Sequence, residues 1–77
     1  MDIKVLGPGC RNCTLLEERT RQALTDLGVD AEIEKVTDPA AIAGYGVMTT
    51  PGLVVDGVVV ATGKVPTARQ IGGLLTG

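Results

Sequence analysis

Histidine is absent from this 77-residue chain, and aromatic residues are almost absent. Without an imidazole, the chain lacks the side chain that most often acts as a general base near neutral pH and a common ligand of zinc. Hydrolase and zinc-enzyme mechanisms that depend on histidine are therefore excluded. Any catalysis must use other side chains.

Phenylalanine and tryptophan are also missing, and Tyr45 is the only aromatic residue. The core must therefore be built from Val, Leu, Ile and Ala, which suit a small α/β sandwich. A single aromatic ring offers no platform for stacking bases, and the basic residues are scattered along a chain of net charge −2. We therefore expect no nucleic acid among the partners.

Long hydrophobic runs are missing too. No apolar stretch approaches the roughly 20 residues that a membrane-spanning helix needs, and residues 1–6 lead into a strand pattern rather than a secretory signal. We expect a soluble, cytoplasmic monomer that forms a single domain over residues 1–77. In that compartment a cysteine pair is more often redox-active or metal-binding than a permanent crosslink.

The first half of the chain predicts a strand and a long helix. Residues 3–6 form a short aliphatic run, which the turn Gly7-Pro8-Gly9 ends. Residues 11–27 predict a helix, because apolar or small side chains recur every three or four positions. They are Cys13, Leu16, Thr20, Ala23, Leu24 and Leu27. Gly28 follows where a helix C-cap glycine is expected.

The next segment predicts an edge strand and a short helix. Residues 29–36 begin with alternating apolar and charged side chains, which is typical of a half-solvated strand at a sheet edge. Asp38-Pro39 then predicts a helix N-cap followed by proline in the first helical position. The helix over residues 40–43 is expected to be little more than one turn.

The last segment predicts a hairpin and a final helix. Asp56-Gly57 separates two β-branched runs, which favours a tight antiparallel turn. Thr67 and Gln70 have the spacing of a capping box, and the apolar side of the helix that follows is expected to be Ile71, Leu74 and Leu75. The element order is thus β-α-β-α-β-β-α. The helical crossover implies parallel first strands, so we predict an α/β fold with a four-stranded mixed sheet flanked by three helices.

The two cysteines are three residues apart at the start of the long predicted helix, in the run Cys10-Arg11-Asn12-Cys13. Side chains with this spacing share a helix face, so the two sulfurs can bond reversibly. Cys10 is expected at the N-cap, where unpaired N–H groups and the helix dipole favour a thiolate. Cys13 belongs to the buried stripe. We therefore assign Cys10 as the attacking sulfur and Cys13 as the sulfur that resolves the mixed disulfide.

Other roles for the same pair remain open. A structural disulfide that closes so short a loop would add little stability. Two thiolates could instead hold a linear soft cation such as Cu(I), which would make the chain a metal carrier. A third possibility uses the exposed edge of residues 58–60 to bind another chain.

Pro51 follows Thr50 just before the predicted hairpin, where proline keeps the preceding residue out of helical angles. A cysteine pair after the first strand and Thr-Pro before a hairpin together resemble the thioredoxin superfamily. More narrowly, the chain resembles the small, glutaredoxin-sized redox-active disulfide proteins of prokaryotes. The residues that carry this resemblance are 7–13, 50–57 and Gly63.

The resemblance implies a cis peptide between Thr50 and Pro51, and an extended substrate segment that pairs with the backbone of Thr50 near Cys10. The substrate-binding residues would be Thr50, Pro51, Pro8 and Gly9. No cofactor is implied. The partners would be disulfide-containing proteins and an upstream reductase or membrane electron carrier.

Two interpretations are possible for each of three side chains near this predicted site. Met48 and Tyr45 either line the substrate groove or fill the core. Lys4 either points to solvent or faces inward, where it would favour a thiolate.

Overall fold

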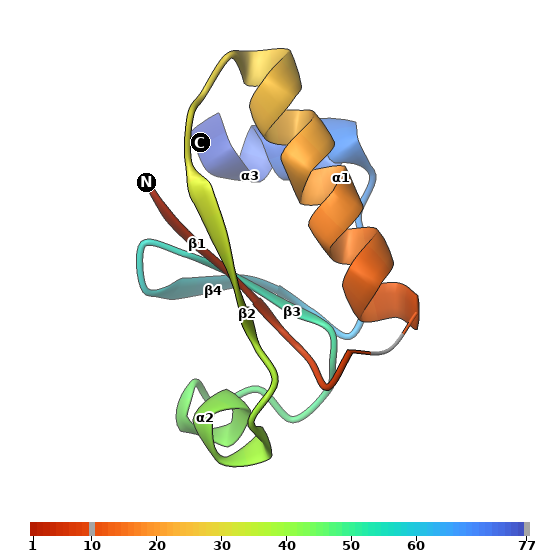
Figure 1. Cartoon of the computed structure of the whole chain (residues 1–77), viewed down its shortest axis with the longest axis vertical. Helices are drawn as coiled ribbons and strands as arrows, with labels where there is room; N and C mark the ends of the chain where they lie inside the picture. Colours follow the sequence, from red (N-terminus) through yellow and green to blue (C-terminus); the bar gives the residue numbers. More distant parts are fainter. Residues whose placement is uncertain (10, 77) are drawn as a thin grey trace.

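A computed structural model describes residues 1–9 and 11–76 of the chain. Within that part, four strands form one sheet and three helices pack around it (Figure 1). The elements are β1 (Asp2–Leu6), α1 (Arg11–Leu27), β2 (Glu32–Val36), α2 (Pro39–Gly44), β3 (Gly52–Val55), β4 (Val58–Thr62) and α3 (Ala68–Thr76). The predicted element order is confirmed.

The strand order in the sheet is β2-β1-β3-β4. β1 and β2 are parallel, with Asp2 opposite Glu32 and Leu6 opposite Val36. β3 is antiparallel to both β1 and β4. The sheet is therefore mixed, as expected, and β2 lies at its edge.

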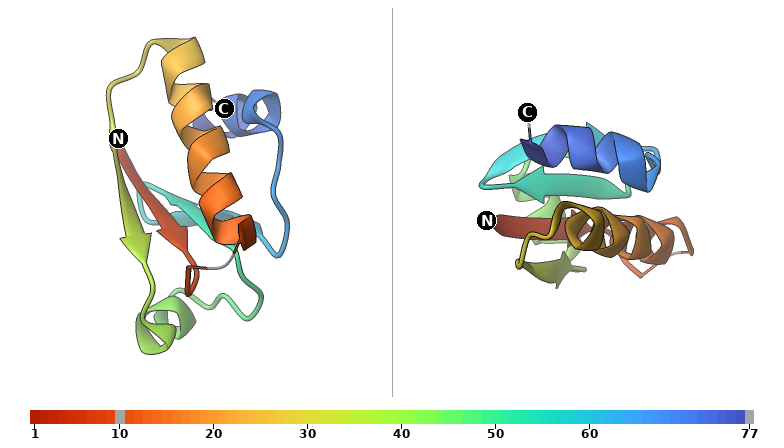
Figure 2. Two further views of the ribbon diagram at one scale, coloured as in Figure 1. Left: turned by 45° about the vertical axis from the view of Figure 1, so that its right-hand side comes forward. Right: turned by 90° about the horizontal axis from the view of Figure 1, so that it is seen from above.

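The two faces of the sheet bury different side chains, because successive residues of a strand point to opposite sides. On one face, Ile3, Val5 and Leu53 pack with residues of α1 and α3. On the other, Leu6 and Val54 pack with residues of and after α2. Figure 2 shows α3 beside α1, with α2 at the far end of the molecule.

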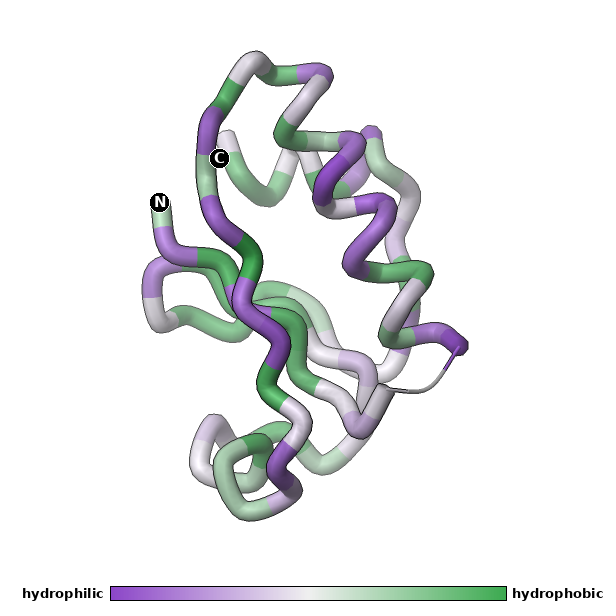
Figure 3. Tube along the Cα trace, in the orientation of Figure 1, coloured by the Kyte–Doolittle hydropathy of each residue, from purple (hydrophilic) through white to green (hydrophobic). Residues whose placement is uncertain are grey.

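Helix α1 forms over the predicted residues and is amphipathic, as the alternating colours along it in Figure 3 illustrate. Its buried residues are Cys13, Leu16, Thr20, Ala23 and Leu24. The hydroxyl of buried Thr20 donates to the carbonyl of Leu16 at 2.7 Å, which satisfies its polar atom inside the core. Leu27, the last apolar residue of this pattern, is 39% exposed.

Two expectations need correction. The second strand begins at Glu32 rather than at position 29, although Val29 and Ala31 still pack against the core. The reason is that the N–H of Val29 donates to Leu24 of α1, so this residue completes the helix end instead of a strand ladder. Leu74 was expected on the buried side of the last helix and is 39% exposed, whereas Ile71 is fully buried.

The local turn and capping signals are confirmed. Asp56 and Gly57 both have positive φ, 51° and 81°, as a tight hairpin turn between twisted strands requires. The side chain of Asp38 accepts from the N–H of Ala40 at the start of α2. Thr67 and Gln70 bond to each other reciprocally, side chain to backbone, before α3.

No helix among the described residues is both long enough and apolar enough to cross a membrane.

Candidate functional site

The candidate site lies where β1 ends and α1 begins. Cys13 sits in the first turn of α1 and is only 5% exposed. It packs directly against Gly7: a Cβ built on Gly7 would overlap the sulfur of Cys13. Gly7 is itself fixed to the sheet, because its N–H donates to Val36 at 2.9 Å. The absence of a side chain at position 7 therefore lets the sulfur of Cys13 lie against the end of β1.

Cys10 lies outside the described residues, so its predicted position at the helix start and its role as the attacking sulfur stay predictions.

Thr50 and Pro51 belong to a second segment that borders Gly7. The same Cβ on Gly7 would lie 3.9 Å from the Cβ of Thr50, so Thr50 and Cys13 flank one glycine. The peptide between Thr50 and Pro51 is cis, as the resemblance implied. Pro51 is buried, and its carbonyl accepts from the N–H of Gly63 at 2.8 Å. The sequence segments around Cys13 and Thr50, far apart along the chain, thus meet at one end of the sheet.

The other two predicted substrate-binding residues, Pro8 and Gly9, are both exposed beside the site. Pro8 and Thr50 line a shallow hollow of about 210 Å³, together with residues of and after α2. Gly9 instead lines a smaller cavity of about 20 Å³ next to Cys13. Pro8 and Thr50 are therefore brought together, and Gly9 lies on the side of Cys13.

The structure distinguishes between the two interpretations of Met48 and Tyr45, as groove-lining or as core residues. Met48 is 99% exposed and lines the hollow with Pro8 and Thr50, so it belongs to the surface of the site. Tyr45 packs against the core cluster under α2, and its hydroxyl lies 3.1 Å from the ammonium of Lys4.

Lys4 does not face Cys13. It alternates with Ile3 and Val5 along β1, so it lies on the α2 face of the sheet, where its ammonium is near Glu34 at 3.7 Å and Asp2 at 3.9 Å. The hydrogen bond with Tyr45 and the nearby carboxylates raise the pKa of Lys4. The inward-facing alternative is therefore wrong.

Two charged residues next to Cys13 were missed from the sequence. Glu17 follows Cys13 by one helical turn, and its carboxylate is 2.9 Å from the ammonium of Lys35 on β2. Lys35 and Cys13 line the same small cavity. The sequence did contain a signal for Lys35. Ile33 and Lys35 are two residues apart on one strand, so their side chains lie on the same face of the sheet, and position 35 points toward α1.

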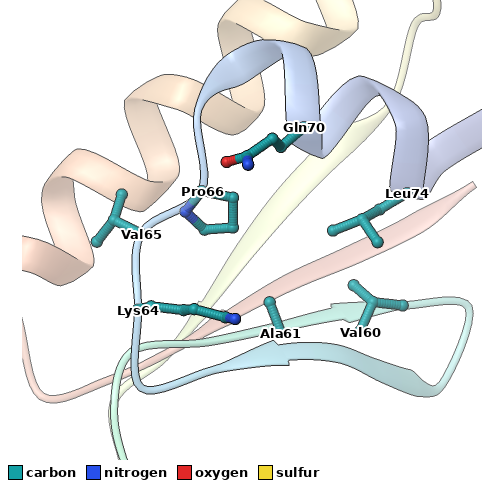
Figure 4. A pocket seen from close by; sticks show the side chains of 7 residues that line it. All are labelled: Val60, Ala61, Lys64, Val65, Pro66, Gln70 and Leu74. Carbon is teal, nitrogen blue, oxygen red and sulfur yellow. The ribbon is translucent and has the colours of Figure 1, made fainter.

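A second groove, of about 310 Å³, runs between β4 and α3. Figure 4 shows its lining: Val60 and Ala61 on β4, Leu74 and Gln70 on α3, and the connecting segment of Lys64, Val65 and Pro66. Cys13, Thr50 and Pro51 do not line this groove, so it is separate from the candidate site. Among residues 1–9 and 11–76, no three acidic or cysteine side chains gather as a metal site would require.

A four-stranded mixed sheet, a buried cysteine at the start of the first helix and a cis-proline before the hairpin define a thioredoxin-like protein. The family model of the thioredoxin domain matches residues 1–76. The chain is 40% identical over 76 residues to a thioredoxin of Methanothermobacter thermautotrophicus, covering 99% of each chain. It is 44% identical over 69 residues to a thioredoxin of Methanocaldococcus jannaschii, covering 90% of this chain and 79% of that one.

The chain therefore belongs to the thioredoxin family. Thioredoxins are thiol–disulfide oxidoreductases, and this is the enzyme class of the protein.

Proposed function

We propose that this protein exchanges a dithiol for a disulfide with protein substrates through Cys10 and Cys13. The observation that carries the proposal is the position of Cys13, which is buried in the first turn of α1 against Gly7, the glycine that also borders Thr50 of the cis Thr50–Pro51 segment. Cys10 immediately precedes α1 in the sequence. A thiol at that position gains from the unpaired N–H groups and the dipole of a 17-residue helix, both of which stabilise an anion.

The reaction has two steps. The Cys10 thiolate attacks one sulfur of the substrate disulfide, and the other substrate sulfur leaves as a thiolate. The Cys13 thiolate then attacks Cys10, which breaks the bond to the substrate and leaves a Cys10–Cys13 disulfide. Because Cys13 is buried, it meets a sulfur held on its neighbour far more readily than one in solution. Electrons from an upstream reductase or membrane electron carrier regenerate the dithiol.

The substrate is an extended, disulfide-containing protein segment that pairs with the backbone of Thr50 and passes over Pro8, Gly9 and Pro51. Strand-like pairing draws its affinity from main-chain hydrogen bonds and its selectivity from side-chain pockets. The hollow lined by Pro8, Thr50 and exposed Met48 is the nearest such pocket, and its apolar walls suit an aliphatic side chain.

The test is reduction of insulin by the purified protein with dithiothreitol as electron donor. We expect Cys10→Ser to abolish turnover, and Cys13→Ser to accumulate a mixed disulfide that mass spectrometry detects as a covalent adduct. Undiminished turnover in Cys10→Ser would remove the mechanism. Tight, stoichiometric Cu(I) binding by a wild type that lacks reductase activity would favour the metal carrier instead.

A further inference from the structure

The groove between β4 and α3 lies outside the candidate redox site and has mainly apolar walls (Figure 4). The apolar side chains come from three segments: Val60 and Ala61 of β4, Val65 and Pro66 of the connection, and Leu74 of α3. Leu74 is 39% exposed, so part of this apolar surface faces solvent. The volume of about 310 Å³ is within the size range of pockets that hold ligands.

A bulge in β4 explains why two consecutive side chains line this groove. Ala61 stands opposite Leu53 and Val59 opposite Val54, so Val60 lies between them as an extra residue of β4. Side chains of a regular strand alternate between the two faces of the sheet, whereas a bulge re-aims one of them. Val60 and Ala61 accordingly both pack on the face covered by α1 and α3, while Val59 packs on the other. Without the bulge, only one of the two could line the groove.

The connecting segment beside the groove is held in place by α1. A guanidinium nitrogen of Arg19 donates to the carbonyl of Val65 at 3.1 Å and to that of Pro66 at 3.3 Å. The ring of Pro66 also fixes its own φ. Because this wall is ordered before a partner arrives, binding loses less conformational entropy there.

The charge around the groove has one sign. Residues 57–77 contain Lys64 and Arg69 but no Asp or Glu, although the chain as a whole has a net charge of −2. Lys64 is the only charged residue that lines the groove, and Arg19 brings a further cation to its wall. Charge complementarity therefore favours a partner that carries carboxylates. A second copy of the chain would place cation against cation at this surface, which disfavours self-association.

The sheet indicates the conformation of such a partner. β4 pairs only with β3 and is an edge strand of the described sheet. The strand Val58–Thr62 contains neither proline nor a charged residue, both of which commonly protect an edge. Backbone groups on its free side can therefore pair with an extended segment, as in other cases of strand addition. The bulge at Val60 limits this pairing to a short stretch.

We propose that this groove docks an extended acidic segment of a partner protein. An aliphatic side chain of the segment lies against Val60 and Leu74, and a carboxylate pairs with the ammonium of Lys64. In an extended chain, side chains two residues apart lie on the same face. The aliphatic and acidic residues of the segment are therefore two positions apart.

The groove adjoins the candidate redox site at one end. Lys64 directly follows Gly63, whose N–H donates to the carbonyl of Pro51 at 2.8 Å. A partner that docks its acidic segment here would thus hold a neighbouring disulfide close to the Thr50–Pro51 segment. This consequence rests on the proposed function, whereas the docking itself does not.

A peptide without cysteine tests the docking apart from any redox step. The probe is the acetylated and amidated peptide TVTETVT, whose sequence is the same in both directions and whose valine and glutamate side chains share one face when it is extended. The control peptide carries glutamine in place of glutamate. Binding is measured from the amide chemical shifts of the ¹⁵N-labelled protein as each peptide is added.

We expect the shifts to concentrate in β4, residues 63–66 and α3. The glutamate peptide should bind about two to five times more tightly than the glutamine peptide, which is the effect of one exposed ion pair. Lys64→Met should remove this preference and leave binding of the glutamine peptide unchanged. Leu74→Gln should weaken both peptides equally, because it removes part of the apolar wall. Arg69→Met is the matched control, since it removes a cation that does not line the groove, and the preference should persist.

Several outcomes would overturn the proposal. Shifts confined to Pro8 and Thr50 would place the peptide at the redox site instead. A preference that survives Lys64→Met, or one that Arg69→Met removes equally, would indicate general attraction by charge. A dimer of the protein alone, detected by sedimentation and lost on peptide addition, would assign the surface to a second copy. If Lys64→Met fails to fold by circular dichroism, Lys64→Gln replaces it. The peptide has no sulfur, so the result is independent of whether the protein reduces insulin.

Discussion

Alanine at position 7 is the substitution that most directly tests the packing of Cys13. Gly7 is buried, and its φ is not among the positive values of the chain, so alanine is compatible with the backbone there. The obstacle is steric. The added Cβ would overlap the sulfur of Cys13 and lie 3.1 Å from its Cβ, which is closer than ordinary van der Waals contact.

Relief requires movement of an anchored element. The N–H of Gly7 is bonded to Val36, and Cys13 belongs to the same buried stripe as Leu16. Overpacking of this kind costs about 1–3 kcal/mol. With a midpoint near 2 kcal/mol, we expect Tm to fall by roughly 8–16 °C in a domain of this size.

Urea and thermal unfolding of the reduced protein measure this cost. The matched control is Gly73→Ala, the same substitution within α3, where an added Cβ meets nothing within 4 Å. Because alanine favours a helix over glycine, Gly73→Ala should stabilise the protein by up to about 1 kcal/mol. If Gly7→Ala is as stable as the parent while Gly73→Ala behaves as expected, the sulfur of Cys13 does not pack against Gly7 as described.

Two further predictions concern stability. Asp38→Ala removes the side chain that accepts from Ala40 at the start of α2, and it should lower the free energy of unfolding by about 1 kcal/mol, as measured by urea denaturation with Asp30→Ala as an exposed control. The pKa of Glu17 is lower in the folded protein than its usual 4.5, so its contribution to stability is present above that value and is lost as pH falls through the folded pKa. Unfolding curves from neutral to acidic pH should therefore show a weaker loss of stability in Glu17→Gln than in the parent; parallel curves would contradict the assignment.

Local chemistry made much of the fold predictable. The Asp56-Gly57 turn, the Asp38 cap and the Thr67–Gln70 box each depend on residues within a few positions of one another, and all three form as expected. Leu27 and Leu74 are each 39% exposed although they belong to the apolar positions of their helices, because periodicity identifies the apolar side of a helix but not how far a neighbouring element covers it. Coverage of that kind is decided by packing between segments that are distant in sequence.

The candidate site was predictable only in part, because only some of its features depend on residues that are close in sequence. The Thr50–Pro51 segment matches a pattern of the family and could be recognised from the sequence alone. In the structure this segment lies next to Gly7, against which Cys13 packs. The contact between Glu17 and Lys35 depends on how α1 lies over β2, which no local spacing encodes. The alternation of side chains along the second strand places Lys35 on the same face as Ile33 and could have shown that Lys35 faces inward. A lysine at that position, however, is easily taken to mean that the apolar alternation has ended.

The edge position of β2 explains how a charge pair can lie next to the buried cysteine. One side of β2 has no neighbouring strand, so Lys35 can lay its aliphatic stem against the interior and still keep its side chain 57% exposed. Glu17 occupies the border of the buried stripe of α1, directly after Leu16, and is shielded without being central to the core. The same pair in the central strand β1 would bury both charges fully and cost far more. A shielded charge pair is thus compatible with this small core where α1 lies over the edge strand β2.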